Sequence, residues 1–513
     1  MPIKNAPQLR VEFTLDRTSD VSLDRQIAQA IRNAVRSGQL QPGDRLLPIR
    51  TLVKHIGVAR ATIDLAYKKL IAEGILESYH GCGTFVSTKL PLHNNFEHVP
   101  AASDSSVPVK AKIAGRHAAV CARALEDLAV QPSMPLAIAC TSREASPGKE
   151  FADILSRKAQ QDLLRLTYSD PQGLPELREA VCGLAERLRG VKATPDRVII
   201  TTGSQLGLMM SLKILFSPDD KVWIEDPQYP LLRAAAATQD IRPVYVPVDK
   251  QGFSLEKALE MDPDARGVFL TPSHQCPLGM MLGIQRRLDI LHWARTNGTW
   301  IVEDDYDSEL RYGGNLSYPS LQGMDTSGNV VYVGTFSKAL FPGLRLGYMV
   351  VPPELVKPFA GMRFLIDRQC NELLQSSVAE YIRQGLYEEH LMRMRHVFEA
   401  RRDYLIEAVN KNFGDWGEFI STGQGMNVTF AFSNPKIDDE AVCAECRAQG
   451  VEVRSISSFT TSTTMYKGLV MGFGHFRPGQ LLAAASRIGF ILRDKFAAFG
   501  PQTPDLAPKA GLT

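Results

Sequence analysis

The residues best suited to covalent chemistry lie around Lys338, which follows the apolar run 330–333 and precedes Arg345 by seven positions. A lysine just after a buried strand is a candidate Schiff-base amine, because desolvation favours the neutral amine that condenses with an aldehyde. The hydroxyl residues Thr335 and Ser337 and the arginine Arg345 are suited to holding a phosphate dianion. The alternative is a solvated lysine on a strand-to-helix loop, and this stretch alone does not decide between the two.

Other polar groups follow predicted strands elsewhere in the chain. The run Thr202-Gly203-Ser204-Gln205 opens a helix, where free amides and the positive end of the dipole could hold a phosphate. Tyr229 follows another strand and could stack on a flat ring. His274 and Gln275 lie in a loop bounded by prolines, where their side chains could reach a ring oxygen. Each of these motifs also fits an ordinary turn or loop.

The run Glu303-Asp304-Asp305-Tyr306-Asp307 places four carboxylates after the predicted strand 299–302. Four carboxylates are too costly to bury without partners, so the alternative is a solvated loop. A carboxylate paired with a protonated pyridine nitrogen would keep the ring cationic and able to accept electrons. Together these groups make up a candidate pyridoxal 5'-phosphate (PLP) site. It has a lysine for the imine, a carboxylate for the ring nitrogen, a tyrosine for the ring hydroxyl, an aromatic residue to cover the ring, and amides, hydroxyls and an arginine to hold the phosphate.

The elements that must position these residues alternate between strand and helix. The short apolar runs are 197–201, 221–225, 242–246, 267–271, 299–303, 330–333 and 346–351. Strands this apolar are covered on both faces, which predicts a mostly parallel sheet. Ligands bind such sheets at the carboxyl ends of the strands, where the polar runs follow.

Residues 10–88 have a different pattern. We expect a helix capped by Ser22, a second helix over Pro48–His55 and a third from Arg60 to about Glu73. Two short strands, 75–79 and 84–86, are joined by a glycine-rich turn at His80–Gly83. Three helices followed by a hairpin are typical of a winged helix-turn-helix domain.

The candidate DNA-binding residues lie on this segment. Arg60 and Thr62 begin the third helix, which would enter the major groove, and Arg50 begins the preceding one. Gly81 and Gly83 leave the tip of the wing free of bulk. Residues 1–88 carry 12 Lys and Arg against 8 Asp and Glu, whereas the whole chain has a net charge of only +2. The alternative is a small helical module that binds a protein.

The rest of the chain gives further expectations. We expect a flexible linker at 89–133, with a possible helix around 117–128, an α/β domain at 134–495 and a disordered tail at 496–513. The eight cysteines form no disulfide framework, and Cys443 and Cys446 lack a second pair for a metal site. No long apolar segment occurs. We therefore expect a cytoplasmic protein without a metal or a membrane partner.

Residues 37–87 resemble the DNA-binding domain of the GntR family. The resemblance rests on Gly43-Asp44-Arg45-Leu46, Gly57-Val58, Glu73-Gly74 and Gly83-Thr84-Phe85-Val86. One departure is Leu46-Leu47-Pro48-Ile49, where the family has Leu-Pro-Ser. A bulky apolar residue therefore replaces a small polar N-cap before the second helix.

The larger domain resembles the fold-type I aminotransferases, and specifically their regulatory branch, the MocR family. The matching runs are Tyr168-Ser169-Asp170-Pro171-Gln172-Gly173-Leu174, Thr202-Gly203-Ser204-Gln205, Glu225-Asp226-Pro227-Gln228-Tyr229-Pro230, Thr271-Pro272-Ser273-His274-Gln275, Glu303-Asp304-Asp305-Tyr306-Asp307-Ser308-Glu309 and Gly334-Thr335-Phe336-Ser337-Lys338. The resemblance implies an α/β fold with a smaller C-terminal α+β subdomain. It also implies a head-to-tail homodimer that regulates transcription by binding double-stranded operator DNA.

The same resemblance implies roles for individual residues. Lys338 would carry the PLP aldimine, Asp304 would pair with the pyridine nitrogen, and Tyr306 would meet the ring hydroxyl. The implied phosphate-holding residues are Arg345, Thr335 and Ser204, and Tyr168 would come from the partner subunit. The effector would be PLP itself or an amino compound that reacts with it.

One position departs from the aminotransferase pattern. Aminotransferases carry an arginine that clamps the substrate carboxylate in a run like Arg-Leu-x-Phe, and here the run is Val470-Met471-Gly472-Phe473. Valine cannot pair with a carboxylate, and the nearby Arg454 and Arg477 do not fit the motif. This departure favours a regulator that detects an amine. The alternative is an aminotransferase with a vestigial DNA-binding domain.

Overall fold

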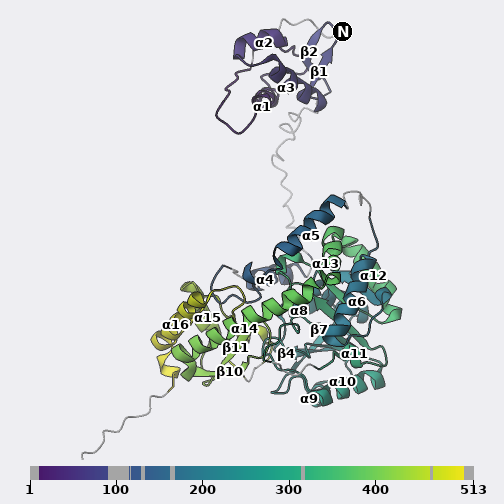
Figure 1. Cartoon of the computed structure of the whole chain (residues 1–513), viewed down its shortest axis with the longest axis vertical. Helices are drawn as coiled ribbons and strands as arrows, with labels where there is room; N and C mark the ends of the chain where they lie inside the picture. The colour runs from purple at the N-terminus through teal and green to yellow at the C-terminus, as the bar shows by residue number, and fades with distance from the viewer. Residues whose placement is uncertain are drawn as a thin grey trace, which may run out of the picture. The chain divides into compact units, whose positions relative to one another are not determined.

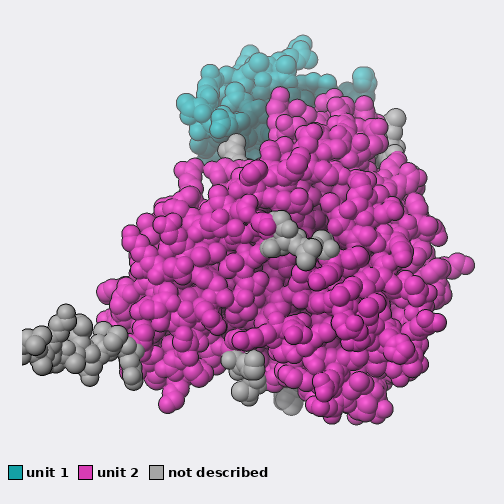
Figure 2. Space-filling model, turned by 60° about the horizontal axis from the view of Figure 1, so that its bottom comes forward, with its two compact units in different colours: residues 1–113 teal, residues 114–513 magenta. Residues whose placement is uncertain are grey.

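The computed structural model describes residues 11–89, 115, 117–128, 133–141, 143–161, 168–313, 318–462 and 466–501. The chain forms two compact units, residues 1–113 and 114–513 (Figures 1 and 2). Much of the predicted linker and most of the predicted tail lie outside the described residues. Within the predicted linker, helix α4 occupies Ala118–Leu128. No helix among the described residues is long and apolar enough to cross a membrane.

The first unit is a three-helix domain with a hairpin, as predicted. It contains α1 (Leu23–Arg36), α2 (Ile49–Ile56), α3 (Arg60–Ala72), β1 (Leu76–Tyr79) and β2 (Gly83–Val86). Apolar residues spaced three or four apart place Ile27, Ile31 and Ile63 in one buried core. Gly57 ends α2 with a left-handed φ of 66°, which turns the chain sharply into α3.

Two details of the predicted helix starts are wrong. Ser22 stands at the N-cap of α1, but its side chain makes no capping hydrogen bond. The second helix begins at Ile49 rather than Pro48, which is itself the N-cap residue. Proline fixes the extended entry to α2 without a side-chain cap, since its φ is pre-set.

The second unit is built on a seven-stranded sheet, in the order β3-β9-β8-β7-β6-β4-β5. The strands are β3 (Val198–Thr201), β4 (Lys221–Asp226), β5 (Arg242–Pro247), β6 (Gly267–Leu270), β7 (Trp300–Asp305), β8 (Val330–Thr335) and β9 (Gly347–Val350). The prediction of a mostly parallel sheet is confirmed, because β4 to β8 all run parallel. Strand β9 runs antiparallel to both of its neighbours, β3 and β8, which an apolar run cannot reveal.

Helices cover both faces of this sheet (Figure 1). Successive strand residues point to opposite sides: Val198 and Ile200 join one buried cluster, and Ile199 joins another. The helices of this unit, besides α4, are α5 (Gly148–Gln161), α6 (Pro175–Arg189), α7 (Ser204–Leu215), α8 (Pro230–Ala236), α9 (Leu255–Met261), α10 (Ile284–Asn297), α11 (Leu321–Met324), α12 (Val356–Asp367), α13 (Glu372–Arg383), α14 (Leu386–Phe413), α15 (Asp439–Ala448) and α16 (Pro478–Lys495).

The C-terminal part of the second unit forms the smaller α+β layer that the resemblance implied. Its antiparallel sheet has the order β10-β11-β13-β12. The strands are β10 (Gly417–Ser421), β11 (Asn427–Phe432), β12 (Arg454–Ser455) and β13 (Gly468–Gly472). Phe430 and Met471 pack with Phe398 of α14 and Ile488 of α16 in one core. Residues of this layer, among them Thr429 and Val470, line one cavity together with residues from the carboxyl ends of the parallel strands.

Candidate functional site

A cavity of about 210 Å³ lies where the parallel sheet meets the smaller sheet. Six of the predicted site residues line it, together with residues from the C-terminal strands. The six are Ser204, Tyr229, His274, Asp304, Tyr306 and Lys338. They lie at or just after the carboxyl ends of β3, β4, β6, β7 and β8, so the strand-end rule brings them together as expected.

Lys338 follows β8 and lines the cavity rather than a solvated loop. Burial lowers its pKa from the ordinary lysine value, and the negative charges of Asp307 and Asp304 oppose this shift. A lower pKa increases the fraction of neutral amine, which is the form that attacks a carbonyl carbon.

The acidic run does not form a solvated loop, and three of its carboxylates have partners. Glu303 accepts hydrogen bonds from the amides of Leu321 and Gln322, at 2.9 and 3.0 Å. Asp305 accepts from Arg189 Nε at 2.6 Å and from the Tyr332 hydroxyl at 2.9 Å. The residues Glu303–Asp305 belong to β7 itself, so the prediction that they follow the strand is wrong.

Asp304 lines the cavity, and its Oδ1 atom is buried without a hydrogen-bond partner among the described residues. Asp305 Oδ1 is unpartnered as well, but Arg189 and Tyr332 hold Asp305 through its Oδ2 atom. Burial, followed by the charges of Asp305 and Asp307, raises the pKa of Asp304 to about 8. A cation in the cavity would stabilise its ionised form, since an adjacent opposite charge lowers a carboxyl pKa.

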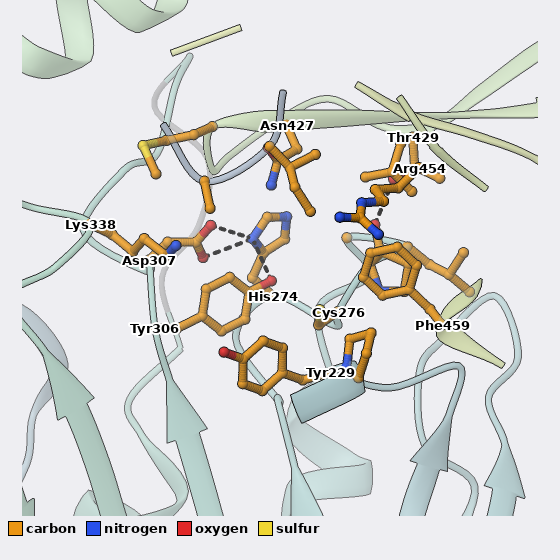
Figure 3. Close-up of a pocket in the computed structure, with 18 of the residues that line it drawn as sticks. Tyr229, His274, Cys276, Tyr306, Asp307, Lys338, Asn427, Thr429, Arg454 and Phe459 are labelled. Atoms are coloured by element: carbon orange, nitrogen blue, oxygen red, sulfur yellow. Dashed lines mark hydrogen bonds and ion pairs between the residues drawn. The ribbon is translucent and has the colours of Figure 1, made fainter. Parts of the chain in front are cut away.

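His274, Tyr306 and Asp307 form one hydrogen-bonded group (Figure 3). His274 Nδ1 lies 2.8 Å from Asp307 Oδ1 and 3.3 Å from the Tyr306 hydroxyl, and the two rings stack. Burial holds the pKa of Tyr306 well above its ordinary value, so its hydroxyl remains a donor. A Cβ on Gly425 would lie 2.4 Å from His274 Cε1, so only glycine fits against this ring.

The start of α7 provides an anion seat. Gly203 has a φ of 93°, and Arg345 Nη2 donates to the carbonyl of Thr202 at 2.9 Å. A Cβ on Gly203 would lie 3.2 Å from the same nitrogen, so glycine lets the guanidinium approach the helix start. The free amides of the first turn and this guanidinium suit a phosphate. Gln205 lies in the same turn and donates to the carbonyl of Leu231 at 3.2 Å.

Six of the predicted residues do not line the cavity: Gln205 and Arg345 at the start of α7, and Gln275, Thr335, Ser337 and Tyr168. Thr335 Oγ1 accepts from the amide of Ser337, and both side chains are buried beside the lysine loop. The Gln275 side chain donates a hydrogen bond to the carbonyl of Pro227 at 2.7 Å, which fixes the loop that carries Gln275. Tyr168 is exposed, with its ring 4.3 Å from the Arg368 guanidinium carbon.

Several residues that line the cavity were not predicted from the sequence. Cys276, Asn427, Thr429, Ser458 and Phe459 all face the cavity. Most belong to the C-terminal layer and reach the site only through folding, so no local motif marks them. Among the described residues no group of three or more His, Cys, Asp or Glu could hold a metal ion. Cys443 and Cys446 are buried in the core around α15.

The predicted DNA-binding residues lie on the first unit. Arg50 and Arg60 are exposed at the starts of α2 and α3, and Thr62 is half-buried. Gly81 is exposed at the hairpin tip with a φ of 73°. Gly83, with a φ of 116°, has a different role, because its Cβ would lie 2.9 Å from Arg45 Nε. Glycine at this position lets Arg45 pack against the hairpin.

Both units match models of known protein families. The model of the family described as bacterial regulatory proteins, gntR family, matches residues 23–86, and that of aminotransferase class I and II matches residues 147–468. The chain is 32% identical to a probable rhizopine catabolism regulatory protein MocR from Rhizobium meliloti, over 91% of this chain and 93% of that protein. It is 28% identical to the pyridoxine biosynthesis transcriptional regulator PdxR from Corynebacterium glutamicum, over 90% and 94% of the two chains.

A solved structure agrees with the fold. The α-aminoadipate aminotransferase LysN from Thermus thermophilus superposes with a TM-score of 0.67 at 25% identity, covering 75% of this chain and 98% of that one. That enzyme was crystallised in complex with N-(5'-phosphopyridoxyl)-L-leucine.

Proposed function

The chain belongs to the MocR-type transcriptional regulators, in which a GntR DNA-binding domain is joined to an aminotransferase class I and II domain, and on this premise we propose that it regulates transcription as a PLP-binding, DNA-binding protein. The observation that carries the proposal is the carboxylate of Asp304, whose buried Oδ1 atom has no hydrogen-bond partner in the part of the chain that the structure describes, in the same cavity as Lys338. A buried carboxylate without a partner is costly, and a protonated pyridine nitrogen would stabilise it.

The remaining residues fit the same group. Lys338 offers the amine, Tyr306 offers a hydroxyl donor, and Tyr229 offers an aromatic face. The start of α7 and Arg345 would hold the phosphate. When bound, PLP supplies an aldehyde that reacts with primary amines and a ring that accepts electrons. His274 and Asp307 would fix the position of the Tyr306 hydroxyl through their shared hydrogen bonds.

We propose detection of an amine rather than its turnover. Val470 lines the cavity at the position of the aminotransferase arginine and is 1% exposed, so this position offers no charge to a carboxylate. An amine that reacts at the site can shift the protein between conformations only if it contacts them differently. Multiple-turnover exchange of amino groups across a broad amino-acid panel would support the enzymatic alternative instead.

The DNA-binding part of the proposal is tested with the full chain, loaded with PLP, and duplexes from the region of its own gene. Specific binding should exceed binding to a scrambled duplex and weaken steeply as salt rises, because phosphate contacts release counterions. The proposal fails if no segment is bound more tightly than the scrambled duplex.

Replacing Asp304 by asparagine is expected to weaken PLP binding by roughly 100-fold, or about 3 kcal/mol. Removing one partner of a buried ion pair leaves the other charge uncompensated, which costs about 3–5 kcal/mol. Fluorescence titration of the cofactor-free protein measures the change. The matched control is Asp264→Asn, whose carboxylate is exposed. Equal affinities for wild type and D304N would assign the ring nitrogen to another group.

We also propose a head-to-tail homodimer in which α12 contributes to the interface. Its last turn exposes Phe364, Leu365 and Ile366, and Leu365 is 79% exposed. Adjacent exposed apolar side chains are typical of an interaction surface. Arg368 follows them and packs on Tyr168, the residue that the resemblance offers to the partner's site.

Replacing Leu365 by glutamate is expected to raise the dimer dissociation constant at least tenfold, because a charge would be buried in the interface. Analytical ultracentrifugation measures the shift, and Met261→Glu on α9 is the control for an exposed apolar residue elsewhere. If both variants sediment like the wild type, α12 does not form the interface.

A further inference from the structure

The backbone is strained at Arg368, the residue that follows α12. Its φ and ψ angles are 65° and −64°, and the amide of Gln369 donates to the carbonyl of Asp367 at 2.8 Å. These angles and this hydrogen bond define a γ-turn of positive φ, a conformation that is rare and strained for a residue with a Cβ. Glycine adopts it without that strain. Such a conformation persists only where the surrounding structure enforces it, and it is typical of functional positions.

Buried contacts hold this turn in place. Arg363 on α12 is fully buried and forms an ion pair with Asp367. Its Nη2 atom donates to Cys370 Sγ at 2.9 Å, and its Nε atom donates to the carbonyl of Ile200 at 3.2 Å. Ile200 belongs to β3, a strand of the seven-stranded sheet. The turn is therefore anchored to the sheet, although Arg368 itself is exposed.

The turn presents Arg368 to an exposed tyrosine. The guanidinium carbon lies 4.3 Å from the centre of the Tyr168 ring and 5.0 Å from the centre of the Phe364 ring. The Gln369 side chain accepts a hydrogen bond from the amide of Ser169 at 2.7 Å, which also holds the backbone next to the tyrosine. Tyr168 is 74% exposed. A cation over an aromatic face fixes the orientation of a ring that would otherwise rotate freely in solvent.

We propose that Arg368 is a positioning residue, which holds Tyr168 in the orientation that lets the tyrosine hydroxyl donate to the phosphate in the partner subunit's PLP site. The strained turn serves this role because it brings the guanidinium over the ring. Helix α12 ends at the turn, so the interface proposed for Leu365 would carry Arg368 and Tyr168 to the second site together. This inference rests on the proposed function, which assigns the PLP site and the homodimer.

The experiment titrates cofactor-free full-length protein with PLP and with pyridoxal, which lacks only the phosphate, and compares the two affinities. Tyr168→Phe should lower the preference for PLP about tenfold, because it removes one hydrogen bond to a charged group. Arg368→Ala keeps the strained backbone, removes the guanidinium and should lower the preference about fivefold. The double variant should lose no more than Tyr168→Phe alone, since the arginine acts through the tyrosine. Arg295→Ala, an exposed arginine in the last turn of α10, is the control and should keep the preference.

Arg368→Gly separates positioning from a purely structural role. Glycine relieves the backbone strain, so the cofactor-free variant should melt about 1–3 °C above Arg368→Ala. It should nevertheless lose the preference for PLP to the same extent, because it also lacks the guanidinium. A stabilised protein with a weakened phosphate preference is a result that loss of packing alone would not give.

Mixed dimers, purified with two different tags, show which site Arg368 serves. A dimer of one Lys338→Ala chain and one Arg368→Ala chain should keep the wild-type preference, because its one reactive site faces an intact Arg368. A dimer of wild type with a Lys338→Ala/Arg368→Ala chain should show the loss. An unchanged preference in R368A or Y168F, a further loss in the double variant, or the opposite pattern in the mixed dimers would overturn the inference. A wild type that is monomeric or shows no cofactor band would instead refute the proposed function.

Discussion

Replacing Lys338 by alanine is expected to abolish the visible absorbance of lysine-bound PLP. The expectation follows from the position of Lys338 in the cavity, after β8, and from the burial that lowers its pKa. No other lysine among the described residues lines this cavity. Absorbance spectra of purified protein incubated with PLP, with borohydride reduction followed by peptide mass analysis, measure the loss and locate the modified residue.

The matched control for this substitution is Lys213→Ala, because Lys213 is exposed on α7. It should leave the band at full intensity. A Lys338→Ala protein that keeps the band, or a reduced cofactor found on another lysine, would show that the assignment is wrong. Thermal melts of both variants separate a loss of the site from a loss of the fold.

Replacing Arg60 by alanine is expected to weaken specific DNA binding by about 10- to 100-fold. Arg60 is exposed at the first position of α3, and a bidentate arginine–base contact is worth about 1–3 kcal/mol. If Arg60 contacts phosphate instead, the loss should be similar across sequences, and the salt slope should fall by about one. Fluorescence anisotropy at several salt concentrations distinguishes the two.

Arg36→Ala is the control for Arg60, because Arg36 is an exposed arginine in the last turn of α1. It removes the same charge from a helix that we do not expect to enter the groove. Equal losses for the two variants would mean that only net charge matters. No loss for R60A would exclude α3 as the recognition helix.

Much of the fold could be predicted because local signals agreed with the final packing. The strands of the parallel sheet are continuous apolar runs, and helix α7 begins at Ser204 as predicted. The antiparallel direction of β9 could not be predicted, because an apolar run has no directional signal. The missing cap at Ser22 also follows from local geometry that residue type alone does not determine.

The candidate site could be predicted only as a set of residues. The strand ends placed Lys338, Asp304 and Tyr306 together, but the sequence could not show which carboxylate is left to pair with the ring nitrogen. That depends on Arg189 and Tyr332, which come from distant positions and pair with Asp305. Likewise, Arg454 lies opposite Val470 only because β12 pairs with β13.

The central claim is that the PLP site and DNA binding are linked in one protein. The most direct measurement is the affinity of full-length protein for a duplex from its own promoter region, at one fixed salt concentration, with and without PLP. We expect PLP to change this affinity by about 5- to 150-fold in wild type, as a coupling of about 1–3 kcal/mol gives. The Lys338→Ala variant should show little or no change. Identical wild-type affinities with and without PLP, at concentrations that saturate the cofactor band, would contradict the account.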